Sequence, residues 1–198
     1  MPSPLEKCFL REMLEVAKDC YYRGWAPATS GNFSIHLRED LVWQSSSGIC
    51  KGRLKPSSFI PVSLSKKASW GYELGRPSEE MLVHLSIYQR RSARCVVHVH
   101  PPHFINFSRG KSELKFQGYE IQKALGSKNF SDQISFRVAP NQKKEELENF
   151  CDNQLDHFID TEAQLIMFEA HGIYAWADSP LQALRSIEAV ESLCIGKT

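Results

Sequence analysis

The chain has 198 residues, with 24 Lys and Arg against 23 Asp and Glu and a formal net charge of +1. This balance argues against nucleic acid or an anionic membrane as a general electrostatic partner. No apolar run reaches the roughly 20 residues of a membrane span, and residues 1–7 lack the apolar core of a signal peptide. We therefore expect one cytoplasmic domain over residues 1–198, with six scattered cysteines as reduced thiols.

The first half of the sequence predicts a helix, then strands, then a second helix. Apolar residues at helical spacing indicate a helix over residues 4–23, which ends at Gly24. Alternating apolar residues predict the strands, at 33–37, 41–44 and 59–62. Residues 64–77 are polar and predict a surface hairpin or loop. The next helix is expected to open at Pro77, with Ser78 as its N-cap.

The second half alternates between further strands and helices. In chain order these are a strand over 96–100 that ends at Pro101-Pro102, a short helix over 118–125, a strand over 134–138, a helix over 143–159, strands over 164–168 and 172–176, and a last helix that begins at Ser179-Pro180. The economical architecture is an α/β fold with a mostly antiparallel sheet and helices on its faces.

Val96-Val97-His98-Val99-His100 carries the clearest chemical signal. Side chains two residues apart in a strand share a face, so His98 and His100 point the same way and the interleaved valines point away. Two imidazoles held side by side suit a metal ion, and His171 is the best candidate for a third ligand. Three imidazoles with one open position would make a catalytic site. The alternative is a strand with two hydrogen-bonded histidines and no metal.

Two loops of small polar residues, Ser30-Gly31-Asn32 and Ser47-Gly48, each adjoin a predicted strand. Such loops can present backbone N–H groups and hydroxyls to a phosphate, with positive charge added by Lys51. Ordinary turns have the same composition, so these residues alone leave both interpretations open. Two glutamates are similarly ambiguous: Glu120 is either a solvated helical residue or a proton carrier, and Glu80 is either a helix-dipole partner or a ligand or base.

Four motifs make the chain resemble the class II aldolase/adducin-like family along nearly its whole length. They are Ala28-Thr29-Ser30-Gly31-Asn32-Phe33-Ser34, Pro77-Ser78-x-Glu80 followed by His84, Val97-His98-Val99-His100, and His171-Gly172. The resemblance implies a three-layer α/β/α fold and a homotetramer with active sites at subunit interfaces. It also implies one Zn²⁺ per subunit, bound by His98, His100 and His171, and a phosphorylated ketose as the substrate.

The resemblance assigns roles to further residues. Glu120 falls on the acid/base glutamate of the family's dehydratases, and Glu80 falls on a position that is a fourth ligand or base in its aldolases. The phosphate-contacting positions of the aldolases correspond to Asn32, Ser47, Gly48 and Ser78, beside which Lys51 adds charge.

Residues 118–125 and the segment His171-Gly172-Ile173-Tyr174-x-Trp176 favour the dehydratases, because the aldolases do not share the glutamate-bearing helix. We therefore expect a zinc enzyme that removes water from a phosphorylated ketose, with a sugar-phosphate aldolase as the alternative. A non-catalytic scaffold of the same fold would not need the three histidines. Two residues at the metal rim, His103 and Glu169, depart from the dehydratase pattern. Imidazole ligands would also suit Fe²⁺ or Mn²⁺.

Overall fold

Alternating apolar residues build a central sheet that is mostly antiparallel. The computed structural model describes residues 4–69 and 75–197, and within them nine strands join in the order β4-β3-β2-β1-β5-β9-β8-β7-β6. Among these described strands, only the β7–β8 pair is parallel. The strands are β1 (Asn32–Arg38), β2 (Leu41–Ser45), β3 (Phe59–Ser63), β4 (Ala68–Ser69), β5 (Cys95–Val99), β6 (Glu113–Phe116), β7 (Ile134–Ala139), β8 (Leu165–Phe168) and β9 (Gly172–Ala177).

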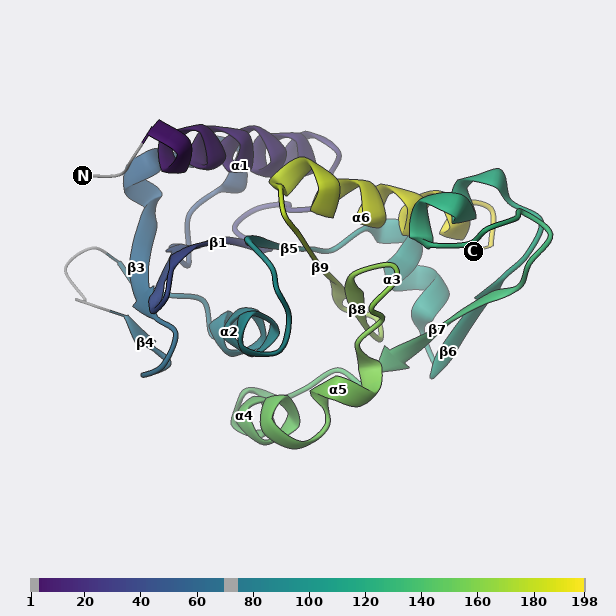
Figure 1. Ribbon diagram of the computed structural model, residues 1–198. Helices are drawn as coiled ribbons and strands as arrows, with labels where there is room; N and C mark the ends of the chain where they lie inside the picture. The colour runs from purple at the N-terminus through teal and green to yellow at the C-terminus, as the bar shows by residue number, and fades with distance from the viewer. Residues whose placement is uncertain (1–3, 70–74, 198) are drawn as a thin grey trace.

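Helices cover both faces of the sheet and give the molecule three layers (Figure 1). The helices are α1 (Pro4–Tyr22), α2 (Met81–Arg90), α3 (Pro102–Ser108), α4 (Lys144–Asn153), α5 (Leu155–Phe158) and α6 (Pro180–Cys194), with the 3-10 helices η1 (Lys51–Arg53), η2 (Pro56–Ser58) and η4 (Glu120–Leu125). Helices α1 and α6 lie together on one face, and α2 and α4 pack against each other on the opposite face. The expected three-layer α/β/α fold is confirmed.

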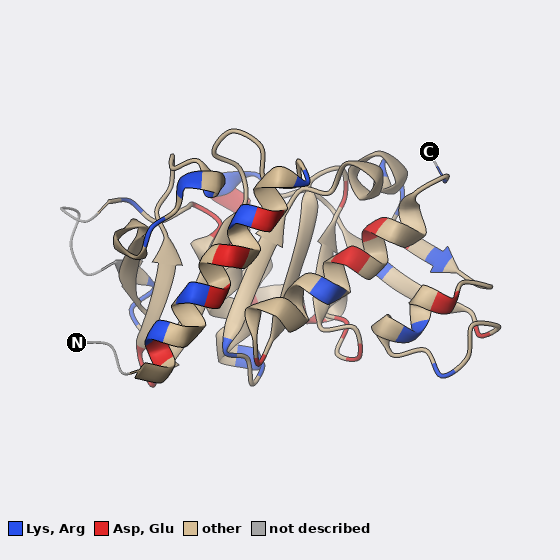
Figure 2. Ribbon diagram, turned by 90° about the horizontal axis from the view of Figure 1, so that it is seen from above, with Lys and Arg blue, Asp and Glu red and all other residues tan. Residues whose placement is uncertain are grey.

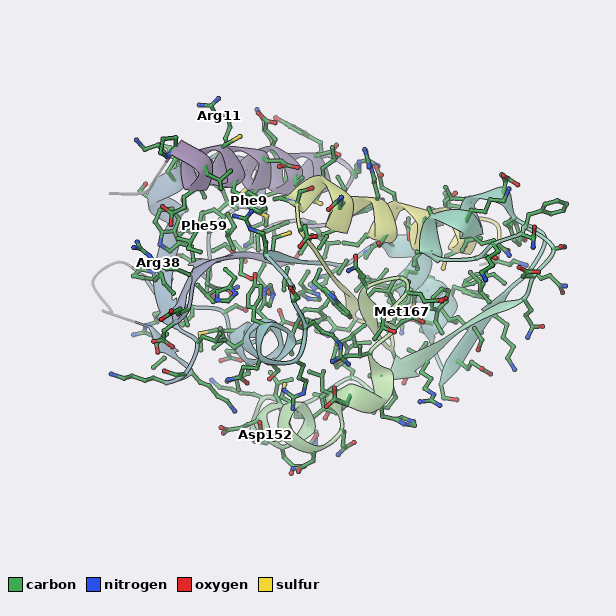
Figure 3. All side chains as sticks on the ribbon, viewed as in Figure 1. Phe9, Arg11, Arg38, Phe59, Asp152 and Met167 are labelled. Carbon is green, nitrogen blue, oxygen red and sulfur yellow. The ribbon has the colours of Figure 1, made fainter. Side chains whose placement is uncertain are left out.

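The outer helices α1 and α6 are amphipathic. Phe9 points from α1 toward the sheet and is buried, whereas Arg11 points away from it (Figure 3). Lys, Arg, Asp and Glu follow the outward faces of both helices (Figure 2). Strand β5 is buried on both sides, because Val97 and Val99 join the core under α1 and α6 while Val96 joins the core around α2.

The predicted strands and the first and last helices are present, within one residue of the expected bounds. The polar segment 64–77 contains the short strand β4, and its residues 70–74 lie outside the described residues. Helix α2 begins later than expected, at Met81, and Ser78 is not its N-cap. Instead, Oγ of Ser78 accepts hydrogen bonds from the Glu80 N–H (3.3 Å) and from Nδ2 of Asn32 (3.4 Å), which holds residues 78–80 as a turn before the helix.

The helix expected over residues 143–159 is divided at Gln154, where the backbone leaves helical geometry at φ −125°. Apolar spacing continues across the break, because Leu147, Phe150 and Leu155 are all buried, so the pattern does not reveal it. Helix α3 and strand β6 were not predicted. The expected helix over 118–125 is the 3-10 helix η4.

No helix within residues 4–69 and 75–197 is long and apolar enough to cross a membrane. The six cysteines are all described, and each is a free thiol, as expected.

Candidate metal centre

Three histidines meet at the end of β5. His98 lies in the strand, on the face that carries Val96, and His100 follows directly after the strand ends, with its Nε2 2.9 Å from Nε2 of His98. His171 lies in the turn between β8 and β9, and β9 pairs with β5. The ring centroid of His171 is therefore only 5.1 Å from that of His98 and 5.0 Å from that of His100. The structure brings the three predicted ligands together.

Gly172 permits this close approach because it has no side chain. A Cβ at this position would lie 2.8 Å from Cδ2 of His100 and 2.9 Å from Cε1 of His98, where ordinary contacts begin at 3.4 Å. It would also collide with the carbonyl oxygen of Val99. The glycine after His171 thus lets the β8–β9 turn close onto the end of β5.

Glu80 is the fourth member of the cluster. Its Oε1 lies 2.8 Å from Nε2 of His171 and 3.5 Å from Nε2 of His98, and its Oε2 accepts a hydrogen bond of 2.6 Å from Nδ2 of Asn32. The four potential ligand atoms lie within 4.8 Å of one another. Burial alone would raise the pKa of Glu80, but its interactions with His98 and His171 outweigh burial and lower the pKa, so the carboxylate is ionised.

His98 and His100 have the protonation state that metal binding requires, and a hydrogen bond orients His98. Nδ1 of His98 donates to the carbonyl oxygen of Ile173 (3.1 Å), which leaves Nε2 as the ligand atom. Burial lowers the pKa of His98, and it lowers that of His100 to about 3, so both rings are neutral near pH 7.

Three of the separations between the potential donor atoms are close to those of a tetrahedral metal site. In a tetrahedral site with Zn–N bonds of about 2 Å, neighbouring donors are about 3.3 Å apart. The observed separations of 2.8 Å (Glu80–His171), 2.9 Å (His98–His100) and 3.5 Å (Glu80–His98) bracket this value. Three imidazoles and one carboxylate are also a donor set that zinc accepts. These residues could therefore hold one zinc ion.

Tyr174 supports two members of the cluster from β9. Its ring stacks on that of His98, with centroids 3.8 Å apart and planes 12° from parallel. Burial, the charge of Glu80 and a hydrogen bond with Glu80 raise the pKa of the Tyr174 hydroxyl well above 10, so the hydroxyl keeps its proton. Sequence reasoning missed this contact, although strand alternation from Gly172 was a usable signal, because it places Tyr174 on the same face.

A row of polar pairs, which we call the polar seam, joins β1 to the turn and helix of α2. It consists of Asn32, Ser34 and His36 facing Glu80, His84 and Tyr88. Oγ of Ser34 lies 2.7 Å from Nδ1 of His84 and 2.8 Å from the hydroxyl of Tyr88. Strand residues two apart and helix residues four apart each share a face, which makes this pairing regular. The seam fixes Glu80 relative to β1.

A cavity of about 320 Å³ opens beside Glu80 and His171. The other residues that line it come from the turns before η1 and α2, from the start of α4 and from β8 and β9: Ser47, Ser78, Glu79, Asn141, Gln142, Lys144, Leu147, Phe168 and Tyr174. The exposed side chains of Glu79 and Lys144 form an ion pair. The volume lies within the usual range for small-molecule sites, so a substrate can reach the cluster through this cavity.

The residues predicted to contact phosphate lie around this cavity at different depths. Ser47 and Ser78 line it, and Gly48 follows Ser47 in an exposed turn. Asn32 is buried behind them, where its amide donates to Glu80 and Ser78. The two serines are therefore the members of this group whose side chains border the cavity.

Lys51 is buried in the protein and is not among the residues that line the cavity. It is 1% exposed, and its Nζ donates to the carbonyl oxygens of Thr29 (2.8 Å) and Ile49 (2.9 Å). Burial lowers the pKa of Lys51 to about 8. The lysine therefore ties together the two loops of small residues from which phosphate contacts were predicted.

Glu120 lies apart from the histidine cluster. Its side chain is 71% exposed and pairs with Lys123 at 2.6 Å. In the single chain Glu120 is a solvated residue, because η4 packs against α6 and leaves Glu120 facing solvent. Its neighbours Tyr119 and Ile121 are also exposed.

The two residues that depart from the dehydratase pattern have partners within the protein. The buried carboxylate of Glu191 in α6 accepts hydrogen bonds from Nδ1 of His103 (2.8 Å) and from the N–H groups of His103 and Phe104, and so caps α3. Glu169 accepts a hydrogen bond of 2.7 Å from the N–H of Gly110. Both contacts support the segments that flank His100 and His171.

A three-layer α/β/α fold with a histidine and glutamate cluster at the end of its central strands is the arrangement expected from the sequence motifs. The chain matches the class II aldolase and adducin N-terminal domain over residues 11–195, and it belongs to that family. L-fuculose-1-phosphate aldolase from Thermus thermophilus has the same fold, with a TM-score of 0.75, 22% identity and coverage of 96% of this chain and 93% of that one. An aldolase II superfamily protein from Pseudomonas syringae has a TM-score of 0.79 at 14% identity, covering 98% and 76% of the two chains.

The chain is also similar over most of its length to methylthioribulose-1-phosphate dehydratases. The protein of that name from Methylococcus capsulatus is 36% identical over 186 residues, which cover 92% of this chain and 89% of the relative. That from Xanthomonas oryzae pv. oryzae is 33% identical over 201 residues, covering 97% and 88%.

Proposed function

We propose that this chain is a zinc-dependent methylthioribulose-1-phosphate dehydratase, a carbon–oxygen lyase. It would convert 5-methylthioribulose-1-phosphate to 2,3-diketo-5-methylthiopentyl-1-phosphate in the cytoplasm, as a step of methionine salvage. The observation that carries the proposal is the cluster of His98, His100, His171 and Glu80 beside an open cavity, in a chain 36% identical to a dehydratase of this name. We also propose that residues 1–198 form one domain.

His98, His100 and His171 would hold the zinc ion, with Glu80 as a fourth ligand or as a base. When bound, the ion supplies a Lewis acid that stabilises negative charge on the C2 oxygen of the substrate. The chain's own residues orient these ligands: Asn32 fixes one oxygen of Glu80, the backbone carbonyl of Ile173 fixes the tautomer of His98, and Tyr174 fixes the ring plane of His98. The phosphate would lie against Ser47, Gly48 and Ser78, with Asn32 and Lys51 ordering these loops.

Glu120 would carry the proton. Its carboxylate takes the proton from C3 and gives it to the C4 hydroxyl, which leaves as water, and the resulting enol tautomerises to the 2,3-diketone. Because Glu120 is exposed and outside the cluster of its own chain, we propose that it serves the site of a neighbouring copy in a homotetramer. The exposed apolar residues beside it, Tyr119 and Ile121, support a subunit contact at this surface.

Two variants test this role. Glu120→Gln should abolish turnover while leaving zinc bound, and Glu148→Gln, which changes an exposed glutamate on α4, is the matched control. If Glu120 acts across an interface, co-expression of Glu120→Gln with His98→Ala should restore about a quarter of wild-type activity. In randomly assembled oligomers, about a quarter of all sites combine an intact His98 from one subunit with an intact Glu120 from its neighbour. Near-normal activity of Glu120→Gln would refute the role of the glutamate, and a mixture without activity would refute action across the interface.

A sugar-phosphate aldolase is the second candidate, favoured by the place of Glu80 against two histidines and by the fold shared with L-fuculose-1-phosphate aldolase. In that reaction Glu80 would act as base, and a C–C bond would break in place of a C–O bond. Incubation of the zinc-loaded protein with 5-methylthioribulose-1-phosphate separates the two: a dehydratase yields the diketone, and an aldolase yields a smaller aldehyde.

A further inference from the structure

The cavity beside the cluster has two chemically different sides. Ser78, which precedes Glu80 by two residues, and Ser47 give one side hydroxyl groups. The other side carries the apolar side chains of Leu147 from the start of α4 and Phe168 from the end of β8, and the polar residues Asn141, Gln142 and Lys144 also line the cavity. A row of contacts joins the two sides through the cluster: the Glu80 N–H donates to Ser78, Oε1 of Glu80 lies 2.8 Å from Nε2 of His171, and the ring centroid of His171 is 6.2 Å from that of Phe168.

The apolar side is a fixed part of the protein. Phe168 is 2% exposed, and its ring packs against those of Phe150 and Tyr174, with both pairs of centroids 5.5 Å apart. Leu147 is buried in the same apolar cluster. Neither side chain offers a hydrogen bond, so a hydroxyl placed against them would lose its water partners without replacement.

We propose that Leu147 and Phe168 form the subsite for the methylthio end of the substrate, which rests on the proposed function. When C2 and C3 of a five-carbon ketose phosphate lie at the cluster, the two ends of its chain point to opposite sides. One end is C1 with the phosphate, and the other is C5. The serine side suits the phosphate, and the leucine and phenylalanine side suits a group that accepts no strong hydrogen bond. A thioether also gains from contact with an aromatic ring. The subsite therefore selects a methylthio group over the hydroxyl of an ordinary pentulose phosphate.

Binding of two unreactive ligands tests the subsite without relying on turnover. 5-Methylthioribitol 1-phosphate and ribitol 1-phosphate both lack the C2 ketone and differ only in the group at C5. Calorimetry on the zinc-loaded protein should show that the methylthio compound binds about tenfold or more tightly. In Leu147→Asn this preference should fall to about twofold or less, while affinity for ribitol 1-phosphate stays within about twofold of wild type.

Matched variants separate a specific effect from a loss of folding. Leu82→Asn makes the same change at a half-buried leucine that lines a neighbouring depression and not this cavity, and it should keep the full preference. Phe168→Leu keeps an apolar side chain but removes the ring, and it should lower the preference only in part. Because Leu147→Asn replaces a buried residue, Phe168→Leu keeps the proposal testable if that first variant does not fold.

The possible results distinguish this subsite from the proposed function. Equal affinities in the wild type, or equal weakening of both ligands in both variants, would overturn the subsite. If the wild-type protein forms the diketone but the variants keep their preference, the subsite alone is wrong. If the preference is present and lost in the variants but no diketone forms, the subsite holds and the dehydratase proposal is wrong.

Discussion

Adding a single methyl group at Gly172 should disable the metal centre without changing any ligand. A Cβ there would meet the rings of His100 and His98 at 2.8 and 2.9 Å, so each ring must move by about 0.5 Å to reach an ordinary contact of 3.4 Å. Metal–ligand distances tolerate shifts of only about 0.2 Å. Loss of the contacts that orient metal ligands typically lowers metal affinity about 10- to 100-fold, and we expect a loss of that order for Gly172→Ala.

Competition with a chromogenic chelator measures this zinc affinity directly, and thermal unfolding of the metal-free protein reports whether the fold survives. Ile173→Val is the matched control, because it trims a buried residue of the same strand whose side chain lies in the core of the opposite face. It should cost about 1 kcal/mol of stability and leave zinc affinity unchanged. A Gly172→Ala protein that binds zinc as tightly as the wild type would refute the argument that this glycine sets the histidine positions.

Two further changes probe the surroundings of the cluster. Tyr174→Phe keeps the ring stacked on His98 and should change zinc affinity by less than about threefold. Tyr174→Leu removes the ring and should lower zinc affinity about tenfold. Equal effects of the two variants in chelator competition would exclude stacking as the cause. The last change is Lys51→Met, for which the quantity to measure is the unfolding free energy of the wild type minus that of the variant. This difference should rise with pH between about pH 8 and 10.5, by at most about 1.4 kcal/mol per pH unit. The folded chain loses the Lys51 proton in this range and the unfolded chain keeps it, so a difference that falls with pH in denaturant titrations would contradict the lowered pKa.

The parts of the site that could be predicted from the sequence are those set by local geometry. Strand alternation placed His98 and His100 on one face, because that relation needs no knowledge of the rest of the chain. The motif around His171 was sufficient to nominate it, and the β5–β9 pairing then explains how it reaches the pair. Glu80 was left open between dipole partner and ligand, and only its contacts with His98 and His171 bring it into the cluster.

Features that depend on packing between distant segments could not be predicted. A lysine beside small polar loops suggests a phosphate contact, yet Lys51 donates to two backbone carbonyls. The sequence does not distinguish these two roles. For Glu120 the sequence left a solvated residue and a proton carrier as alternatives, and its exposure in a single chain depends on how η4 packs against α6. The break in the helix at Gln154 could not be predicted from the apolar spacing either, because Leu155 is buried and continues the helical spacing across the break.

The polar seam between β1 and α2 also bears on how the chain finds its native strand register. Asn32 pairs with His98 across the sheet and with Glu80 through its side chain, so β1 is tied to β5 and to α2 at one point. A slip of β1 by one residue would turn Phe33 and Ile35 toward Glu80 and His84, and Oε2 of Glu80 would lose the amide that donates to it. Loss of a hydrogen bond to a charged group costs about 1.5–3 kcal/mol. Misregistered folding intermediates are therefore disfavoured before any metal binds, and the residues that assemble the site also select against its incorrect assembly.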